Sequence, residues 1–293
     1  MKKYITILFA FLILPFVAFA QEDDTKKEKK VKEQLERPAF ESATLINNPT
    51  NVLFKKDVLE VMLQHRFGLM NNGGANDLAG FWAPSNIRIG LSYAIHERVT
   101  IGYGTTKFSR LQDFNWKVGL LRQTKSNKVP VSITYYGNFT VDARKKENFT
   151  NIQDRYSNFN QLIFARRFSP KFSAQVAPSI SHYNIVKNTM RNDMVAIAFG
   201  GRYKISDQTS ILIDYSQPLT KFLEDNPPAG ISFGVEFGTS AHTFSIFATN
   251  YNGIVPQQNY MFNKNDGFGP NSPFGKGGGD FLIGFNITRN YYF

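Results

Sequence analysis

The chain has no cysteine among its 293 residues. This absence excludes a disulfide framework, a thiol nucleophile and a thiolate metal site. Histidine is scarce as well, since only His65, His96, His182 and His242 are present. We expect His96 in a turn and His242 at the edge of one, where neither is placed to join a cluster. The sequence therefore predicts no metal site and no cofactor.

Long hydrophobic runs are missing after residue 20, although hydrophobic residues make up 42% of the chain and aromatic residues 15%. This is the composition of a transmembrane β-barrel, whose strands alternate polar and apolar residues, and also of a soluble all-β protein. The chain has 28 Phe, 13 Tyr and 22 Gly. These favour the barrel, because aromatic girdles and strongly curved strands use such residues.

Acidic residues are the minority charge, with 23 Asp and Glu against 34 Lys and Arg and a net charge of +11. A basic chain raises nucleic acid as a partner, but Lys and Arg are spread along this sequence without a recognition motif. We expect the positive charge to face anionic lipid head groups or to line an anion-preferring pore. No nucleic acid partner is predicted.

Residues 1–20 have the features of a secretory signal peptide. Lys2 and Lys3 precede an apolar run over residues 4–16, and residues 18–20 give a small-x-small cleavage pattern. The run is shorter than the ~20 residues that span a bilayer as a helix, which disfavours an uncleaved anchor. We expect an exported protein.

Two segments lie between this signal peptide and the regular part of the chain. Residues 21–37 carry balanced acidic and basic charge with little apolar surface, which predicts a flexible or partly helical periplasmic tail. Residues 38–56 are mixed, and their apolar side chains are irregularly placed. This second segment forms either a plug in a lumen or a lead-in across the periplasmic rim, and the sequence leaves both open.

From Val58 onward, polar and apolar residues alternate with a period of two, which indicates strands with two different faces. Most of the predicted strands are near the ~9–11 residues that a tilted membrane strand needs. The twelve predicted strands are Val58–Phe67, Ile87–Ile95, Val99–Thr106, Asp113–Gln123, Val129–Phe139, Tyr156–Phe168, Phe172–Tyr183, Asp193–Ile205, Thr209–Pro218, Gly230–Gly238, His242–Asn250 and Asp280–Phe293. Pro178 lies mid-strand, where the loss of a backbone donor predicts a bulge or a shorter strand.

The predicted connections alternate between long and short along the chain, and the strand count is even. Both features are typical of up-and-down barrels in the bacterial outer membrane, with both ends of the chain on the short-turn side. We therefore predict an all-β, antiparallel transmembrane β-barrel of about 12 strands over residues 57–293. Its short turns are expected in the periplasm and its long loops outside the cell.

The last predicted strand has an apolar face that includes Phe285, Ile287, Tyr291 and Phe293, interrupted by Arg289. A strand that ends on an aromatic residue resembles the closing strand of bacterial outer-membrane barrels. This resemblance implies that the four apolar residues form a barrel-closing signal for the barrel-assembly machinery.

The strand faces that oppose the apolar ones define a set of candidate lumen residues. They are Glu60, Arg66, Arg88, Lys117, Arg202, Lys204, Asp214 and Glu236. One interpretation is a polar, mildly basic conduit for a small polar or anionic solute. The other is a set of compensating ion pairs that closes a narrow barrel, since a buried charge needs a partner. Twelve strands lie between barrels filled by side chains and open porins, so strand number favours neither.

No catalytic residue is predicted. The architecture resembles an outer-membrane phospholipase that uses a lipid-facing His and Ser, and Ser181 and His182 supply these residue types. Adjacent strand residues point to opposite faces, however, so Ser181 and His182 cannot pair.

The run Leu59–Gly68, shortly after Ser42–Asn47, resembles the entry into a family of uncharacterised bacterial outer-membrane β-barrels. This resemblance covers about Pro38–Phe293 and implies fold and location, without any catalytic residues. The expected function is that of a passive channel or small-solute transporter among outer-membrane lipids. A non-conducting structural or assembly partner is the alternative, and a lipid-facing hydrolase is a remote one.

Overall fold

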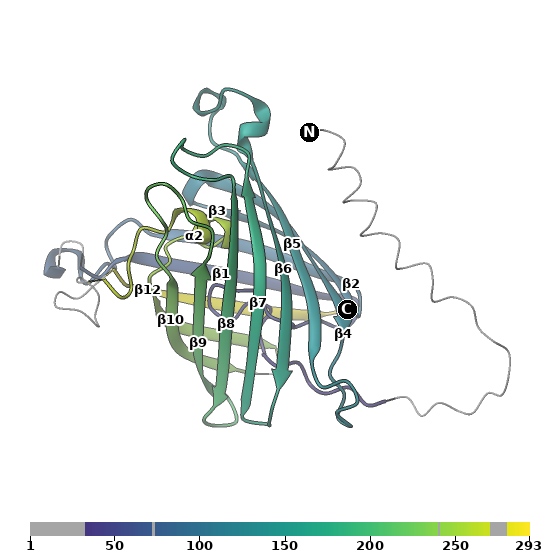
Figure 1. Ribbon diagram of the computed structural model, residues 1–293. Helices are drawn as coiled ribbons and strands as arrows, with labels where there is room; N and C mark the ends of the chain where they lie inside the picture. The colour runs from purple at the N-terminus through teal and green to yellow at the C-terminus, as the bar shows by residue number, and fades with distance from the viewer. Residues whose placement is uncertain (1–32, 72–73, 240, 270–279) are drawn as a thin grey trace, which may run out of the picture. The chain divides into compact units, whose positions relative to one another are not determined.

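The computed structural model describes residues 33–71, 74–239, 241–269 and 280–293. Within these residues the chain forms a closed antiparallel barrel of twelve strands, as the sequence predicts (Figure 1). The predicted signal peptide, residues 1–20, and the tail up to residue 32 lie outside the described residues.

The strands follow one another around the barrel in chain order. They are β1 (Val58–Leu69), β2 (Asn86–His96), β3 (Val99–Thr106), β4 (Leu111–Leu121), β5 (Ser132–Asp142), β6 (Tyr156–Arg167), β7 (Phe172–Tyr183), β8 (Asp193–Lys204), β9 (Thr209–Pro218), β10 (Gly230–Gly238), β11 (His242–Thr249) and β12 (Leu282–Tyr292). One α-helix, α2 (Pro256–Phe262), and the 3₁₀ turns η2 (Gly74–Asp77), η3 (Phe108–Arg110), η4 (Lys146–Asn148) and η5 (Ile152–Arg155) lie in connections. Among the described helices, none has the length and apolar composition to cross a membrane.

The barrel closes where β1 pairs with β12, with Val58 opposite Tyr292 and Gln64 opposite Asn286. A closed ladder leaves no free strand edge, and every strand satisfies its backbone groups on both sides. This is the arrangement that a β-protein needs to span a bilayer.

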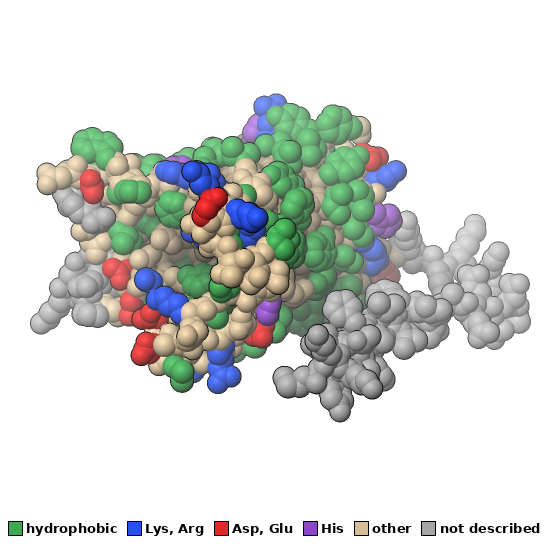
Figure 2. Space-filling model, turned by 90° about the horizontal axis from the view of Figure 1, so that it is seen from above, with side chains coloured by type: hydrophobic (Ala, Val, Ile, Leu, Met, Phe, Trp, Pro, Cys, Tyr) green, Lys and Arg blue, Asp and Glu red, His purple; other side chains and the backbone are tan. Residues whose placement is uncertain are grey.

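The outer surface of the wall is apolar. Ile213 on β9 is 57% exposed and Ile89 on β2 is 52% exposed, whereas the neighbouring Leu212 and Arg88 point inward and are buried. Figure 2 shows hydrophobic side chains gathered over the visible side of the wall. The predicted alternation is therefore correct on β2 and β9, because the period of two decides which residues face outward.

The predicted bulge or shortening at Pro178 is wrong. β7 runs without interruption, and Pro178 lies opposite Ile197 in a register with β8 that does not shift. The pairs on either side, Ser179 with Gln161 and Val176 with Phe164, keep one register with β6. The Pro178 ring faces outward. The hydrogen bonds of β7 with β6 and β8 on both sides of Pro178 keep the strand in register.

The connections form two ends, which we call the short-turn end and the long-loop end. Among the described residues, the short-turn end comprises residues 97–98, 122–131, 168–171, 205–208, 239 and 241, and the long-loop end comprises residues 70–71, 74–85, 107–110, 143–155, 184–192, 219–229, 250–269 and 280–281. Each end also includes the strand ends that border it, and the short-turn end includes the exposed residues before β1. The expected alternation of lengths fails at one place, since 107–110 is shorter than 122–131. The longer turn is paired with the incoming chain: Glu36 N donates to Gln123 O at 2.8 Å, and Leu35 bridges Thr124.

Candidate functional site

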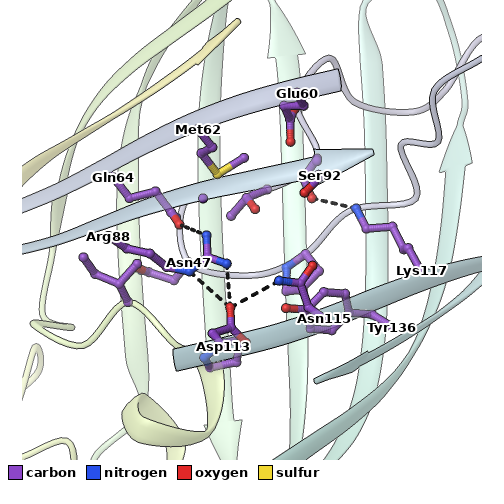
Figure 3. A pocket seen from close by; sticks show the side chains of 16 residues that line it. Asn47, Glu60, Met62, Gln64, Arg88, Ser92, Asp113, Asn115, Lys117 and Tyr136 are labelled. Atoms are coloured by element: carbon purple, nitrogen blue, oxygen red, sulfur yellow. Dashed lines mark hydrogen bonds and ion pairs between the residues drawn. The ribbon is translucent and has the colours of Figure 1, made fainter. Parts of the chain in front are cut away.

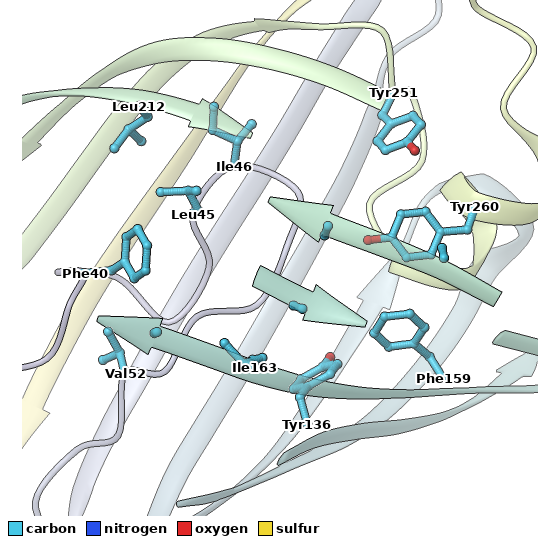
Figure 4. Packing of buried hydrophobic residues seen from close by; sticks show 14 of the residues in the cluster. Phe40, Leu45, Ile46, Val52, Tyr136, Phe159, Ile163, Leu212, Tyr251 and Tyr260 are labelled. Carbon is cyan, nitrogen blue, oxygen red and sulfur yellow. The ribbon is translucent and has the colours of Figure 1, made fainter. Parts of the chain in front are cut away.

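Residues 38–56, which we call the plug, lie inside the barrel except for residues exposed at the short-turn end, among them Glu41, Lys55 and Lys56. Phe40, Leu45, Ile46 and Val52 are all less than 5% exposed. They pack in one cluster with lumen-facing residues of the wall, among them Ile163 on β6 (Figure 4). The irregular apolar residues of this segment therefore form a core inside the barrel rather than on its surface.

The wall beside this core is built from small residues. Ala165, Ala177, Ala196 and Ala198 on β6, β7 and β8 are buried in the same cluster. At Gly200 on β8, an added Cβ atom would lie only 2.7 Å from Leu45 Cδ2. Small side chains on this wall leave the space that the plug fills.

A turn at Asn47 and Asn48 ties the plug to β9. The Asp214 carboxylate accepts hydrogen bonds from the backbone N–H groups of Asn47 at 2.8 Å and Asn48 at 3.1 Å. It also accepts one from the Asn48 side-chain amide at 2.5 Å. The Asn47 side chain donates to Ser232 and Thr249 on the next two strands. With three donors from the plug, the Asp214 carboxylate attaches the plug firmly to β9.

Arg66 on β1 holds the same turn from the other side. Its guanidinium donates to Ile46 O and to Asn47 Oδ1, each at 3.1 Å. It also donates to Asn286 Oδ1 on β12 at 3.0 Å, and it lies 4.5 Å from the ring centroid of Phe247. These contacts surround a fully buried charge with backbone and amide oxygens, while Arg66 Nε has no hydrogen-bond partner among the described residues.

The wall of β1 to β4 presents charge instead of apolar packing to the plug (Figure 3). Lys117 on β4 donates to Ala43 O at 2.9 Å, and Arg88 on β2 pairs with Asp113 on β4 at 2.5 Å. A cavity of about 50 Å³ remains between this wall and the plug, and Glu60 also lines it. Asp113 Oδ1 is buried without a hydrogen-bond partner in the described part of the chain. Such a cavity has room for a few water molecules, since one needs ~10–15 Å³.

The long-loop end also contributes to the filling of the lumen, through α2. The Gln257 side chain exchanges hydrogen bonds with Asn138 on β5, at 3.1 and 2.9 Å. The Tyr260 hydroxyl donates to Asn48 Oδ1 of the plug and lies 3.3 Å from Ser216 Oγ. Plug and helix therefore meet in the middle of the barrel, and burial raises the pKa of the Tyr260 phenol.

The structure places the eight predicted lumen residues in three groups and one outlier. Glu60, Arg88 and Lys117 line the cavity, Arg66 and Asp214 hold the turn of the plug, and Arg202 pairs with Glu236 at 2.7 Å. Lys204 is partly exposed at the end of β8, where it pairs with Asp207 at 3.6 Å.

Sequence reasoning missed Asp113, which lies four residues before Lys117 on the inward face of β4. Asp113 and Lys117 are an even number of residues apart, so the alternation that identified Lys117 also predicts an inward-facing Asp113. With Asp113 included, the buried charges of the described residues are four basic and four acidic: Arg66, Arg88, Lys117 and Arg202, and Glu60, Asp113, Asp214 and Glu236. The described interior therefore has no basic excess.

The predicted barrel-closing residues lie on the outward side of β12 and just beyond it. Phe285 stacks on His65 of β1 with ring centroids 5.0 Å apart, and Ile287 lies opposite Leu63. Tyr291 lies opposite Leu59, and Phe293 follows the end of the strand with its side chain exposed.

Ser181 and His182 do not form a catalytic pair. Ser181 is buried on the inward face of β7, whereas His182 is partly exposed and pairs with Asp193 at 2.8 Å. No group of three or more His, Asp or Glu residues that could hold a metal ion occurs in the described ranges.

Comparisons with solved structures identify other barrels. A NanC porin aligns with a TM-score of 0.49 and 6% identity over 80% of this chain and 99% of the porin. An outer membrane channel from Pseudomonas putida F1 aligns with a TM-score of 0.45 and 10% identity over 82% of this chain and 97% of the channel. LpxR from Salmonella typhimurium aligns with a TM-score of 0.36 and 10% identity over 80% of this chain and 100% of LpxR. At these identities and scores the likenesses carry no functional information.

No curated protein matches the chain in sequence. A family model described as "Membrane bound beta barrel domain (DUF5777)" matches residues 40–291, which include the plug and nearly all of the barrel. The chain therefore belongs to this family of membrane-bound β-barrels, whose function is unknown.

Proposed function

We propose that this protein is a bacterial outer-membrane β-barrel that passes small polar solutes through a lumen closed at rest by the plug. Its apolar wall and closed strand ladder fit a bilayer, and the signal-like residues 1–20 fit export. In this arrangement the short-turn end faces the periplasm and the long-loop end faces outward. The plug then enters from the periplasmic side.

The observation that carries this proposal is the different chemistry on the two sides of the plug. Towards β6–β9 the plug packs through Leu45 and its apolar neighbours. Towards β2–β4, Lys117 donates to Ala43 O, and the plug faces a cavity of about 50 Å³. A shift of the plug away from β2–β4 would widen this cavity towards the short-turn end, and a movement of Ile254 and Pro256, which also line it, would open it towards the long-loop end.

The groups that line this route are balanced in charge. Glu60 and Lys117 line the cavity together with the ion pair of Arg88 and Asp113. A route with both signs favours polar or zwitterionic solutes over ions of one sign. We therefore propose a small polar solute without a strong anion preference.

A reversible disulfide cross-link between plug and wall tests the proposal. The chain has no native cysteine, so only the introduced thiols can form a disulfide. In the wild type, Leu45 Cδ2 lies 2.7 Å from the position that a Cβ atom would take at Gly200. The double variant Leu45→Cys with Gly200→Cys therefore places one thiol on the plug next to one on the wall. Conductance is recorded in planar bilayers under an applied potential, with each single-cysteine variant as a control. We expect openings in the wild type and single variants, none in the oxidised double variant, and their return after reduction. Openings that persist in the oxidised double variant would refute a mobile plug.

A non-conducting scaffold is the second candidate, and the number of attachments of the plug favours it. Besides Asp214 and Arg66, the Gln175 side chain donates to Pro49 O at 2.9 Å. Such a network opposes displacement of the plug. Absence of openings in the wild type at all potentials, with the barrel folded, would decide for the scaffold.

A further inference from the structure

The excess positive charge of the described residues is concentrated at the short-turn end. From Gln34 onward, the described residues of this end include twelve basic residues, Arg37, Lys55, Lys56, Arg98, Arg122, Lys125, Lys128, Arg166, Arg167, Lys171, Lys204 and Arg289, and five acidic ones, Glu36, Glu41, Asp57, Glu97 and Asp207.

The long-loop end is nearly balanced by comparison. Its described residues include ten basic ones, Lys107, Arg110, Arg144, Lys145, Lys146, Arg155, Lys187, Arg191, Lys221 and Lys264, and nine acidic ones, Asp77, Asp142, Glu147, Asp154, Asp193, Glu224, Asp225, Asp266 and Asp280. The buried interior charges also balance. The charge excess of the described barrel therefore lies at the edge of the apolar wall, at one end only.

Aromatic and aliphatic side chains mark that edge. Phe168, Phe172, Tyr203 and Ile205 are exposed around the turns between β6 and β7 and between β8 and β9. Phe168 stacks on Phe172 with ring centroids 5.5 Å apart, and Phe172 lies opposite Tyr203 in the ladder. Exposed aromatic rings at the end of an apolar wall are typical of the boundary between the hydrocarbon core and the head groups.

A groove opens at this boundary between the turns 168–171 and 205–208. It is lined by Lys171, Lys204 and Asp207, together with Pro170, Ile205 and Ser206. Lys171 and Lys204 are neighbours across the two strands, since Lys204 N donates to Lys171 O at 2.8 Å. The Lys204 ammonium pairs with Asp207, but the Asp207 side chain is fully exposed, where solvent weakens such a pair.

We propose that this groove binds the phosphate of an anionic phospholipid head group in the leaflet at the short-turn end. Lys171 and Lys204 supply two ammonium groups for the phosphate, while Ile205, Phe172 and Tyr203 provide apolar surface for the acyl chains. Arg166, which lies over the Phe168 ring at 5.2 Å, extends the basic surface towards β5. The proposal depends on the membrane-spanning barrel and not on conduction.

Native mass spectrometry of the full chain in detergent tests the site, with phosphatidylglycerol and phosphatidylcholine as the added lipids. The variant is Lys171→Gln with Lys204→Gln. The matched control is Lys145→Gln with Lys146→Gln, which removes the same charge from the long-loop end. We expect the test variant to weaken phosphatidylglycerol binding roughly thirtyfold, since two Lys near an anionic surface together contribute about 2 kcal/mol. The control variant and all phosphatidylcholine adducts are expected to match the wild type.

Three outcomes would overturn the proposal. Unchanged phosphatidylglycerol binding in the Lys171/Lys204 variant would show that the groove does not bind the head group. An equal loss in the Lys145/Lys146 control would indicate an effect of net charge alone. Displacement of the lipid by millimolar inorganic phosphate would assign the groove to free phosphate instead. Far-UV circular dichroism of every variant checks that the barrel is folded.

Discussion

Asp214 on β9 connects the wall to the plug through three hydrogen bonds, to the backbone of Asn47 and Asn48 and to the Asn48 amide. The carboxylate lies on the inward face of its strand and is 2% exposed. A buried carboxylate in a lumen is stable only when donors surround it, and here the plug provides them. The buried Asp214 carboxylate therefore needs the donors of the plug, and the turn at Asn47 and Asn48 needs the carboxylate as its acceptor.

Replacing Asp214 by Ala is expected to lower the free energy of unfolding by about 3 kcal/mol, because several buried donors lose their acceptor. Ser210→Ala is the matched control, since Ser210 lies on the same face of β9 and its buried hydroxyl has no partner among the described residues. Urea unfolding in detergent, followed by circular dichroism, measures both. Equal losses in the two variants would contradict the role of Asp214.

Tyr260 and Tyr251 make the free energy of unfolding depend on pH in the alkaline range. Burial raises the pKa of both phenols above the ordinary value of about 10. In the unfolded chain these groups lose their protons near that value, whereas in the folded protein they keep them. The folded state then binds more protons, so stability is full below pH ~10 and falls as the pH rises above it.

Tyr260→Phe removes one of these phenols and its hydrogen bond to Asn48. At pH 8 we expect a loss of about 1 kcal/mol from the missing hydrogen bond. Between pH 10 and 11 the variant is expected to lose less stability than the wild type, with Tyr251 still contributing. Tyr203→Phe, on the outer wall, serves as the control. A pH dependence of Tyr260→Phe identical to that of the wild type would contradict this assignment.

At the scale of elements, the sequence predicts all twelve strands, because strand periodicity is a local property of the chain. The bounds of β3, β7, β9 and β10 agree with the prediction to the residue. The largest error is at β5, which begins at Ser132 and not Val129. Val129 continues the apolar alternation, but its N–H bonds to the Thr124 side chain within the turn.

The contents of the lumen were not predictable in the same way. The apolar residues of the plug follow no period, because their contacts come from strands far away in sequence: Leu45 meets Gly200, and Asn48 meets Asp214. The helix α2 was expected to be part of a long loop. Its only local signal is Pro256 at the first position, followed by the apolar Tyr260 and Met261. The alternation of strand residues therefore identifies the lumen-facing residues of the wall. It does not identify the residues of the plug and of α2, which fill the lumen.

The packing of β10 against Tyr251 gives a test at this scale. At Gly230, a Cβ atom would lie 2.1 Å from the ring of the buried Tyr251. Gly230→Ala is expected to destabilise the protein by about 2 kcal/mol through overpacking. Gly201→Ala on β8 is the control, since its Cβ would meet nothing within 4 Å. Thermal unfolding in detergent should separate the two, and similar midpoints would show that Tyr251 moves aside freely.

The whole molecule combines an apolar outer wall with a filled, charge-balanced interior. Ile213, near the middle of β9, is 57% exposed on the outer wall. Ile213→Arg is expected to cost roughly 2–4 kcal/mol of folding into lipid vesicles. Thr209→Arg, at the short-turn end of the same strand, is expected to cost less because the head groups lie near. Equal costs would place β9 outside the hydrocarbon core.

The plug, residues 38–56 of the protein's own chain, fills the lumen of the barrel. Amide hydrogen exchange of the full chain in lipid nanodiscs tests it most directly, at the backbone amides of Asn47 and Asn48. Both amides donate to the buried Asp214 carboxylate, so we predict protection comparable to that of the barrel strands. Complete exchange of these amides within seconds, while the strands stay protected, would show a lumen that the plug does not occupy.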